Sequence, residues 1–534
     1  MSKQNKLMKG FATVGLWTML SRLLGFVREI LIAGTLGSSP IAEAFLVAFS
    51  LPNMFRRFFA EGAFNMAFVP MFSKKVEAAD GSHEFARDAF TMLATILIFF
   101  TILAQIFMPA LVLAMASGFV GDARFDLAVF YGRIAFPYIL FVSLAALLSG
   151  VLNALGRFLI AAAAPVLLNV FFIVAFWLAL LCGWDIGVTL AWTVPLAGIA
   201  QAVAVWIGAS RAGYTLVPRL PRITPDLRRL ARIAVPAALA GGVVQVNLLV
   251  GRQVASWEDA GGAIAWLYYA DRLYQLPLGV VAIAIGVVLL PDLSRKLQSG
   301  DTVGGRDAFN RAGEIALALT VPCSVALCVI PTILISVLFE RGAFTAQDTA
   351  ATAMAVTIYG LGLPAFVLQK VFQPLYFARE DTTRPFYFAL AAMVTNVLIA
   401  IGLAPFIGYI AAALATTVAG WLMFFLLKFY ARGYGDAARF DVRFRRRVPR
   451  IIMASMLMGW VVYGTYLIME PVFDLRLWRH LAFTVMLAAG AMSYIAFGQW
   501  LGAFRVKDFR KALKKKKKKK SRDKKSQDVN ADVS

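Results

Sequence analysis

Long apolar segments recur along the whole chain and are separated by short polar connections. A helix needs about 20 mostly apolar residues to cross the hydrocarbon core of a bilayer. We therefore expect an all-α polytopic membrane protein in which no soluble domain interrupts the spans. Prolines are expected to break the second and eighth spans near Pro52 and Pro277. The pattern predicts fourteen transmembrane helices, over residues 11–33, 41–69, 89–116, 128–153, 158–182, 187–210, 233–251, 261–291, 312–339, 347–377, 385–404, 409–428, 451–470 and 481–503.

The positions of the basic residues predict the orientation of these spans. Of the 53 Lys and Arg residues, 41 fall on the side of the N-terminus and only 5 on the opposite side. Basic connections stay in the cytoplasm, so we expect a multi-pass membrane protein with both termini inside. The tail 505–534 contains seven consecutive lysines and is expected to be disordered against the anionic leaflet.

Seven cations lie inside the expected spans, where topology does not explain them. Each costs about 2.5–3.5 kcal/mol at the bilayer centre on insertion scales, so a segment rich in such residues usually lines a polar cavity. Surplus positive charge in a low dielectric attracts an anion. Some of these charges could instead be interfacial anchors or packing pairs, as the i,i+4 spacing of Arg57 and Glu61 allows. The cations are Arg22, Arg28, Arg56, Arg57, Arg133, Arg272 and Lys370, and Glu29, Glu43, Glu61 and Asp271 accompany them.

Weak internal repetition suggests a duplicated six-helix unit. Leu51-Pro52 recurs as Leu276-Pro277, and Asn169 matches Asn396 at nearly the same offset. Parallel repeats of this kind place a substrate site between two lobes. We expect an N-lobe with spans 1–6, a C-lobe with spans 7–12, two further helices and the basic tail, over residues 1–218, 219–440, 441–504 and 505–534.

Composition argues against several other classes of protein. Three cysteines without CxxC spacing and two distant histidines give no plausible metal or haem site. A P-loop is not seen, so ATP is not the expected driver, and we expect no cofactor. The net charge of +23 reflects membrane topology rather than nucleic-acid binding. A membrane glycosyltransferase would need a large acidic or metal-binding loop, and the connections here are short.

Four stretches resemble the MurJ (MviN) family of bacterial lipid II flippases, which belongs to the multidrug/oligosaccharidyl-lipid/polysaccharide exporter superfamily. The resemblance covers essentially the whole chain, and the run LPN-x-x-RR-x-x-AEGAF is its most specific part. The matching stretches are SRLLGFVRE (21–29), LPNMFRRFFAEGAFNMAFVP (51–70), FPYILFVSLAALLSGVLNALGRF (136–158) and YYADRLYQLPLGVVAIAIGVVLLPDLS (268–294).

The resemblance implies a protein of the bacterial inner (plasma) membrane that exports undecaprenyl-pyrophosphate-linked disaccharide-pentapeptide from the cytoplasmic to the periplasmic leaflet, driven by membrane potential or an ion gradient. It also implies a hydrophobic groove for the lipid chain, formed with spans 13 and 14. Members often carry a basic residue where this chain has Ser50, which puts any role there in doubt. The family's essential arginines match Arg22, Arg28, Arg56 and Arg272, and its acidic residues match Glu29, Glu43 and Glu61.

Elementary chemistry reaches a compatible hypothesis. Guanidinium groups grip phosphate oxygens through forked hydrogen bonds and could replace the hydration of a pyrophosphate. The carboxylates could pair with these arginines when the site is empty. Arg133 and Lys370 are either further cavity cations or snorkelling residues. Bending points are expected at Gly25, Pro52 and Pro277.

Alternative functions stay open from the residues alone. The chain could export another polyprenyl-linked glycan; a drug or cation exporter should have an acidic cavity instead. Beside the lipid-linked precursor, the candidate partners are membrane lipids and the cell-wall synthesis machinery, and we expect a monomer.

Overall fold

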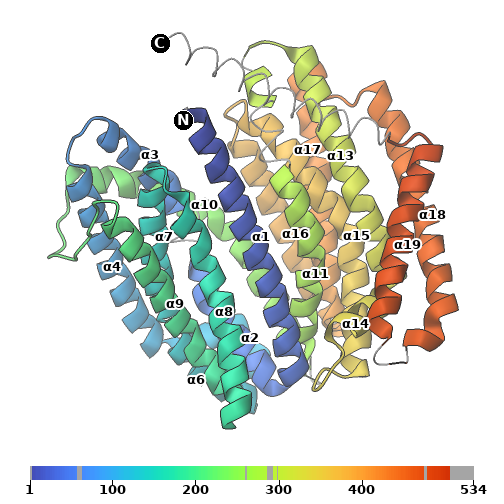
Figure 1. Cartoon of the computed structure of the whole chain (residues 1–534), viewed down its shortest axis with the longest axis horizontal. Coiled ribbons are helices and arrows are strands. Elements are labelled where there is room, and N and C mark those ends of the chain that lie inside the picture. Colours follow the sequence, from blue (N-terminus) through green and yellow to red (C-terminus); the bar gives the residue numbers. More distant parts are fainter. Residues whose placement is uncertain are drawn as a thin grey trace, which may run out of the picture. The chain divides into compact units, whose positions relative to one another are not determined.

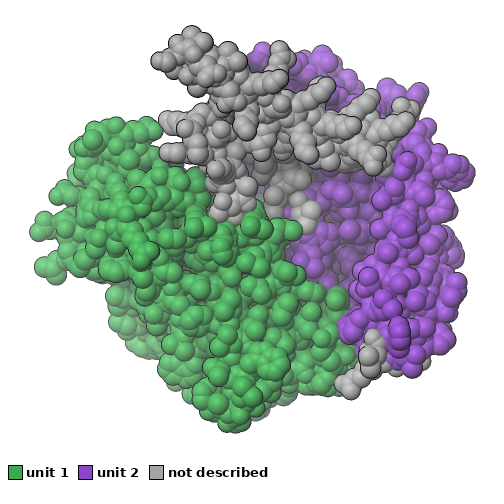
Figure 2. Space-filling model, in the orientation of Figure 1, with its two compact units in different colours: residues 1–270, 338–355, 389–419 green, residues 271–337, 356–388, 420–534 purple. Residues whose placement is uncertain are grey.

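The computed structural model describes residues 3–56, 63–258, 261–284, 293–296, 299–473, 475 and 478–504. All regular elements in these ranges are helices. The chain forms two compact units, which Figure 2 colours separately. Unit 1 comprises residues 1–270, 338–355 and 389–419, and unit 2 comprises residues 271–337, 356–388 and 420–534.

The helices of the first half of the chain belong to unit 1 (Figure 1). They are α1 (Lys3–Leu36), α2 (Pro40–Arg56), α3 (Ala63–Glu77), α4 (Ser82–Ile106), α5 (Met108–Met115), η2 (Ser117–Phe119), α6 (Ala123–Ala135), α7 (Tyr138–Ala154), α8 (Phe158–Cys182), α9 (Ile186–Ser210) and α10 (Pro225–Ser256).

The later helices supply unit 2 and the remaining segments of unit 1. They are α11 (Ala263–Ala284), α13 (Thr302–Val329), α14 (Pro331–Phe339), α15 (Ala346–Phe377), α16 (Thr383–Ile407), α17 (Ile410–Ala431), η4 (Arg432–Ala438), α18 (Val442–Phe473) and α19 (Arg479–Trp500).

Ten helices within the described ranges are long and apolar enough to cross a membrane. The all-helical polytopic prediction is thus confirmed, while the number fourteen stays a prediction. Part of the difference between ten and fourteen arises because α2 and α3, with 17 and 15 residues, are each too short to count as a span. The four expected spans outside the ten coincide with α1, with α2 and α3, with α10 and with α11.

Prolines divide several expected spans into two helices. The span expected at 128–153 consists of α6 and α7, which meet at Pro137, and the break between α13 and α14 lies at Pro331. Proline lacks the N–H that a continuous helix needs, and its ring clashes with the preceding turn. At Pro52 and Pro277, by contrast, α2 and α11 continue past the proline.

Packing inside unit 1 depends on small and polar contacts between helices. Helix α1 packs along α8 (Figure 1), where Asn169 Nδ2 donates to the carbonyl of Ser21 at 2.9 Å. The Asn169 side chain lies within van der Waals distance of the position that a Cβ on Gly25 would take. Small residues allow such close helix contacts inside a membrane, where no hydrophobic force drives association.

In unit 2, α18 packs against both α19 and α13. A buried apolar cluster joins these helices and contains Ile330, Met458, Val462 and Met486. At one end of α18 the buried carboxylate of Glu314 accepts hydrogen bonds from Arg311 at 2.8 Å and Arg447 at 2.9 Å. The hydrogen bond between Arg447 and Glu314 holds the start of α18 against α13. The predicted division into lobes and tail is not tested by these contacts and stays a prediction.

Candidate functional site

A buried ion pair lies on α1 among apolar neighbours. Arg28 Nη2 donates to Glu29 Oε1 at 2.5 Å, and the two residues are only 8% and 2% exposed. Charges buried in this way require a partner, because desolvation costs several kcal/mol per ion. The pair therefore marks a position where the protein maintains charge in an apolar region.

Two phenylalanine rings cover the guanidinium of Arg28. Its Cζ atom lies 5.6 Å from the ring centroid of Phe49 on α2 and 5.1 Å from that of Phe172 on α8. The two rings contact each other edge to face at 5.7 Å. A desolvated cation–π contact contributes up to about 2 kcal/mol and imposes no fixed hydrogen-bond direction. The two rings thus stabilise the guanidinium in addition to its hydrogen bond to Glu29.

The carboxylate of Glu29 has a second partner from a distant part of the chain. The hydroxyl of Tyr268, on α11, donates to the same oxygen, Oε1, at 2.9 Å. Hydrogen bonds to an ionised acceptor are roughly twice as strong as those between neutral groups. Helix α11 thereby contacts the charged pair on α1 within unit 1.

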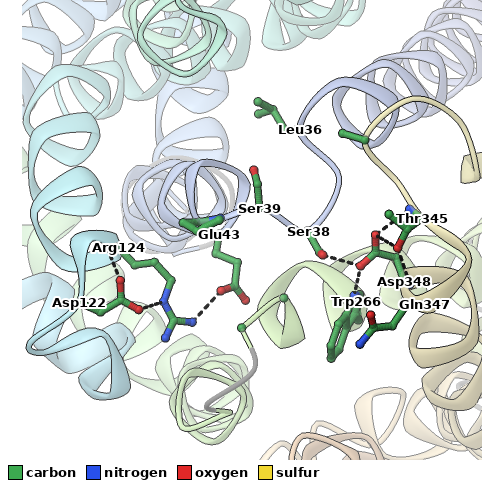
Figure 3. Close-up of a pocket in the computed structure, with 14 residues that line it drawn as sticks. Leu36, Ser38, Ser39, Glu43, Asp122, Arg124, Trp266, Thr345, Gln347 and Asp348 are labelled. Carbon is green, nitrogen blue, oxygen red and sulfur yellow. Dashed lines mark hydrogen bonds and ion pairs between the residues drawn. The ribbon is translucent and has the colours of Figure 1, made fainter.

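Unit 1 also contains a pocket of about 450 Å³ where several connections meet (Figure 3). We call it the loop-end pocket. Its lining combines the α1–α2 connection, the start of α6, the start of α11 and the start of α15. Its polar lining includes Ser38, Ser39, Glu43, Asp122, Arg124, Trp266, Thr345, Gln347 and Asp348.

On one side of the loop-end pocket, Glu43 uses both carboxylate oxygens. Oε2 accepts from Arg124 Nη1 at 2.8 Å, and Oε1 accepts from the backbone N–H of Ile264 at 2.9 Å. Arg124 is held in turn by Asp122, whose Oδ2 lies 2.5 Å from Nε, and by the ring of Phe119 at 4.5 Å. Figure 3 shows the contacts of Arg124 with Glu43 and Asp122. Among the described residues, the cation that contacts Glu43 is thus Arg124 and not one of the arginines expected inside the spans.

Asp122 caps the N-terminus of α6 and lies outside the apolar span. Its side chain accepts from the backbone N–H of Arg124 at 3.1 Å. This hydrogen bond, together with the nearby guanidinium, lowers the pKa of the Asp122 carboxyl below its usual value. The carboxylate is therefore stabilised in its charged form at neutral pH.

On the other side of the loop-end pocket, Asp348 collects donors from three segments. The N–H and hydroxyl of Thr345 donate to Oδ2 at 2.8 and 2.9 Å. Trp266 Nε1 donates to Oδ1 at 2.8 Å, and the hydroxyl of Ser38 donates to the same oxygen (Figure 3). Asp348 therefore joins the α1–α2 connection to the starts of α11 and α15.

Comparison with known families assigns the chain. The family model for the lipid II flippase MurJ matches residues 32–479. The chain belongs to the MurJ family. A probable lipid II flippase MurJ of Rhizobium tropici is 44% identical over 465 residues, which cover 85% of this chain and 86% of the relative. A lipid II flippase MurJ of Burkholderia cenocepacia is 34% identical over 431 residues, covering 79% and 83% of the two chains.

Solved structures agree with this membership. A lipid II flippase MurJ in an inward closed conformation aligns with a TM-score of 0.77 and 26% identity, over 91% of this chain and 97% of that one. An inward-facing multidrug transporter of the MATE family aligns with a TM-score of 0.66 at 14% identity, over 80% of this chain and 98% of that one; this second likeness concerns the fold alone. The predicted family is confirmed, and the protein is a multi-pass membrane transporter of the MurJ family rather than an enzyme.

The other residues predicted for substrate binding occupy varied environments. Arg22 on α1 and Arg133 on α6 are exposed, and Arg56 is half-buried at the end of α2. Unit 2 contains Arg272, which is half-buried on α11, and Lys370, which is exposed on α15. Their assembly around one cavity stays a prediction. Glu61 and Arg57 lie outside the described residues.

The expected bending points lie inside continuous helices. Helix α1 passes Gly25 unbroken, and α2 and α11 pass Pro52 and Pro277. In a membrane, neighbouring helices and side chains can satisfy the carbonyl that a proline leaves unpaired. The hinge roles of these three residues in the MurJ family cycle stay predictions.

Sequence reasoning did not single out three residues of these sites. Arg124 was expected only as a charge in a connection, although its spacing from the helix-capping Asp122 is a recognisable signal. Tyr268 lies in a stretch that resembles the MurJ family, but tyrosine is common at membrane interfaces and carries little signal alone. Asp348 lies in the first turn of α15, where acidic residues are common, so the sequence does not distinguish it.

Proposed function

We propose that the protein moves lipid II from the cytoplasmic to the periplasmic leaflet by alternating access and binds the pyrophosphate through arginines. The proposed ligands are Arg22, Arg28, Arg56 and Arg272, with Arg133 and Lys370 as further cations of the cavity. Membership of the MurJ family supports the substrate. The environment of Arg28 is the observation that supports arginines as the ligands. The rings beside this buried guanidinium stabilise it without fixing the direction of its hydrogen bonds.

The counter-ion of the empty site is Glu29. A bare guanidinium in a low dielectric is costly, and the carboxylate of Glu29 neutralises Arg28 until substrate arrives. The pyrophosphate then takes the place of Glu29 as the hydrogen-bond acceptor for Arg28, through forked contacts that suit two adjacent phosphate groups. The exchange of one anion for another keeps the charge of the region balanced during transport.

We further propose that the loop-end pocket stabilises one state of the transport cycle. Glu43 with the backbone N–H of Ile264, and Asp348 with the hydroxyl of Ser38, join segments that the sequence assigns to different lobes. Separation of the lobes at this end would break both contacts. In the orientation predicted from the basic residues, with both termini in the cytoplasm, this end faces the periplasm and is closed while the cavity is open inward.

The remaining parts of the proposal concern the lipid and the driving force. Helices α18 and α19 pack as a pair beyond the predicted twelve-helix repeat, and with the second lobe they form the groove for the undecaprenyl chain. No cofactor or ATP is needed: membrane potential supplies about 2.3 kcal/mol per charge per 100 mV, and a net-positive cavity that reorients responds to it.

The test is complementation of a strain depleted of its own lipid II flippase, combined with an assay for lipid II accessible on the outer leaflet. Alanine variants of Arg22, Arg28, Arg56 and Arg272 are compared at matched membrane abundance. We expect each to lose outer-leaflet lipid II, and Arg28→Lys to fail with Arg28→Ala because a point charge cannot form the fork. Transport by all four alanine variants at the wild-type level would refute the arginine mechanism.

A further inference from the structure

We propose that Tyr268 is a positioning residue for substrate binding: its hydroxyl stabilises Glu29 when Arg28 leaves that carboxylate for the pyrophosphate. This inference rests on the proposed function of Arg28. Its basis is that Arg28 Nη2 and the Tyr268 hydroxyl donate to the same oxygen, Glu29 Oε1, at 2.5 and 2.9 Å.

The burial of Glu29 makes the second donor important. The residue is 2% exposed, so water cannot replace a lost partner readily. A buried carboxylate that loses its cation pays a desolvation penalty unless other donors remain. When Arg28 turns to an arriving anion, the phenol of Tyr268 remains on Oε1. The hydroxyl therefore lowers the free energy needed to separate Arg28 from Glu29.

Helix α11 is held in place in the turn before this contact, which positions the Tyr268 hydroxyl. The backbone N–H of Ile264 donates to Glu43, and the indole of Trp266 donates to Asp348. These two bonds anchor the turn before Tyr268 to α2 and α15. Three carboxylates from three helices thus accept hydrogen bonds from one short stretch of α11. Tyr268 is the member of this stretch that contacts the proposed substrate-binding pair.

The neighbouring tyrosine provides a matched control. Tyr269 is fully buried, and its hydroxyl has no hydrogen-bond partner among the described residues. Its ring packs against Phe339 at 5.3 Å and Phe344 at 5.5 Å. Tyr269→Phe removes the same atom as Tyr268→Phe, from an adjacent position of the same helix, without removing a hydrogen bond to Glu29.

The experiment titrates purified lipid II into the full-length protein in detergent micelles, for wild type, Tyr268→Phe, Tyr269→Phe and Arg28→Ala. We expect Tyr268→Phe to raise Kd about tenfold, the effect of one hydrogen bond to a charged group, and Tyr269→Phe to leave Kd within twofold. Equal Kd values for the two phenylalanine variants would overturn the role of Tyr268. Wild-type binding by Arg28→Ala would instead show that the proposed function of Arg28 is wrong.

A second comparison separates positioning from a general effect on folding. In a Glu29→Gln background the carboxylate to which both Arg28 and Tyr268 donate is removed, so Tyr268→Phe should change Kd less than about twofold. The same tenfold loss in both backgrounds would show that Tyr268 acts elsewhere and would overturn the inference. Melting temperatures of all variants, measured without lipid II, identify any loss of affinity that comes from unfolding.

Discussion

Two buried carboxylates of unit 1, Glu29 and Glu43, show contrasting surroundings. Glu43 divides its partners between both oxygens, one for the guanidinium of Arg124 and one for the backbone N–H of Ile264. Glu29 concentrates two side-chain donors, from Arg28 and Tyr268, on a single oxygen. Both residues were predicted from sequence as counter-ions of the same set of arginines.

The cations show the same contrast. Arg124 is fixed by two carboxylates, Glu43 and Asp122, and by a ring. Arg28 pairs with Glu29 and lies against the rings of Phe49 and Phe172, which set no hydrogen-bond direction. A pair anchored to backbone and to a second carboxylate suits a closed contact between segments. A pair between side chains beside aromatic rings suits an exchange of partners.

The largest expected effect is on stability and comes from Arg124→Ala. The change leaves Glu43 buried and without its cation, which costs about 3–5 kcal/mol for a buried pair. Thermal unfolding in detergent should show a strongly lowered melting temperature and reduced membrane abundance. Arg228→Ala, an exposed position on α10, is the matched control and should change stability by less than about 0.5 kcal/mol. An unchanged melting temperature for Arg124→Ala would contradict the role of Glu43 and Arg124 as a closed contact.

The second expected effect distinguishes the two carboxylates by substrate affinity. In Glu29→Gln the carboxylate that competes with substrate for Arg28 is removed, so lipid II should bind about tenfold more tightly, by the free energy of one charged hydrogen bond. Glu43→Gln should leave Kd within about twofold, because the pair with Arg124 does not contact the proposed ligands. If both variants changed affinity equally, the contrast between the two sites would be wrong.

The smallest expected effect concerns Asp122. Asp122→Ala removes the N-cap of α6, a change that typically costs about 1 kcal/mol. The folded-state pKa of Asp122 is lowered, so its contribution is complete above the unfolded pKa of about 3.9. It is lost as the pH falls through the folded pKa. The difference in melting temperature from wild type should therefore shrink in acid. Asp122→Asn, which keeps an accepting oxygen, should cost less, and a pH-independent difference would argue against the charged cap.

Sequence predicted the helical architecture well because membrane spans are read from length and apolarity. The breaks were harder to place. Pro331 ends one helix and begins another, whereas α2 and α11 continue through Pro52 and Pro277. The same residue type gives both outcomes, since tertiary contacts decide whether the freed carbonyl is satisfied. The number of spans crossing the membrane depends on segments where charge and prolines weaken the pattern.

The candidate site was predictable to the extent that charge in an apolar segment is informative. Arg28 and Glu29 stood out for that reason. Arg124 did not, because its partner Glu43 lies 81 positions earlier in the chain and a single sequence contains no signal for that pairing. Tyr268 could not be predicted for a similar reason, because its partner Glu29 is also distant in the sequence. Only the fold shows that its hydroxyl contacts Glu29.

The central claim is that Arg28 binds the pyrophosphate of lipid II through a guanidinium fork. The most direct measurement is the Kd of purified lipid II for wild type, Arg28→Lys and Arg28→Ala at equal protein stability. The account predicts that both variants lose roughly ten- to a hundredfold in affinity, as expected for a charged hydrogen bond of about 1.5–3 kcal/mol. Wild-type affinity in Arg28→Lys, with a loss only in Arg28→Ala, would show that charge alone suffices and would contradict the fork.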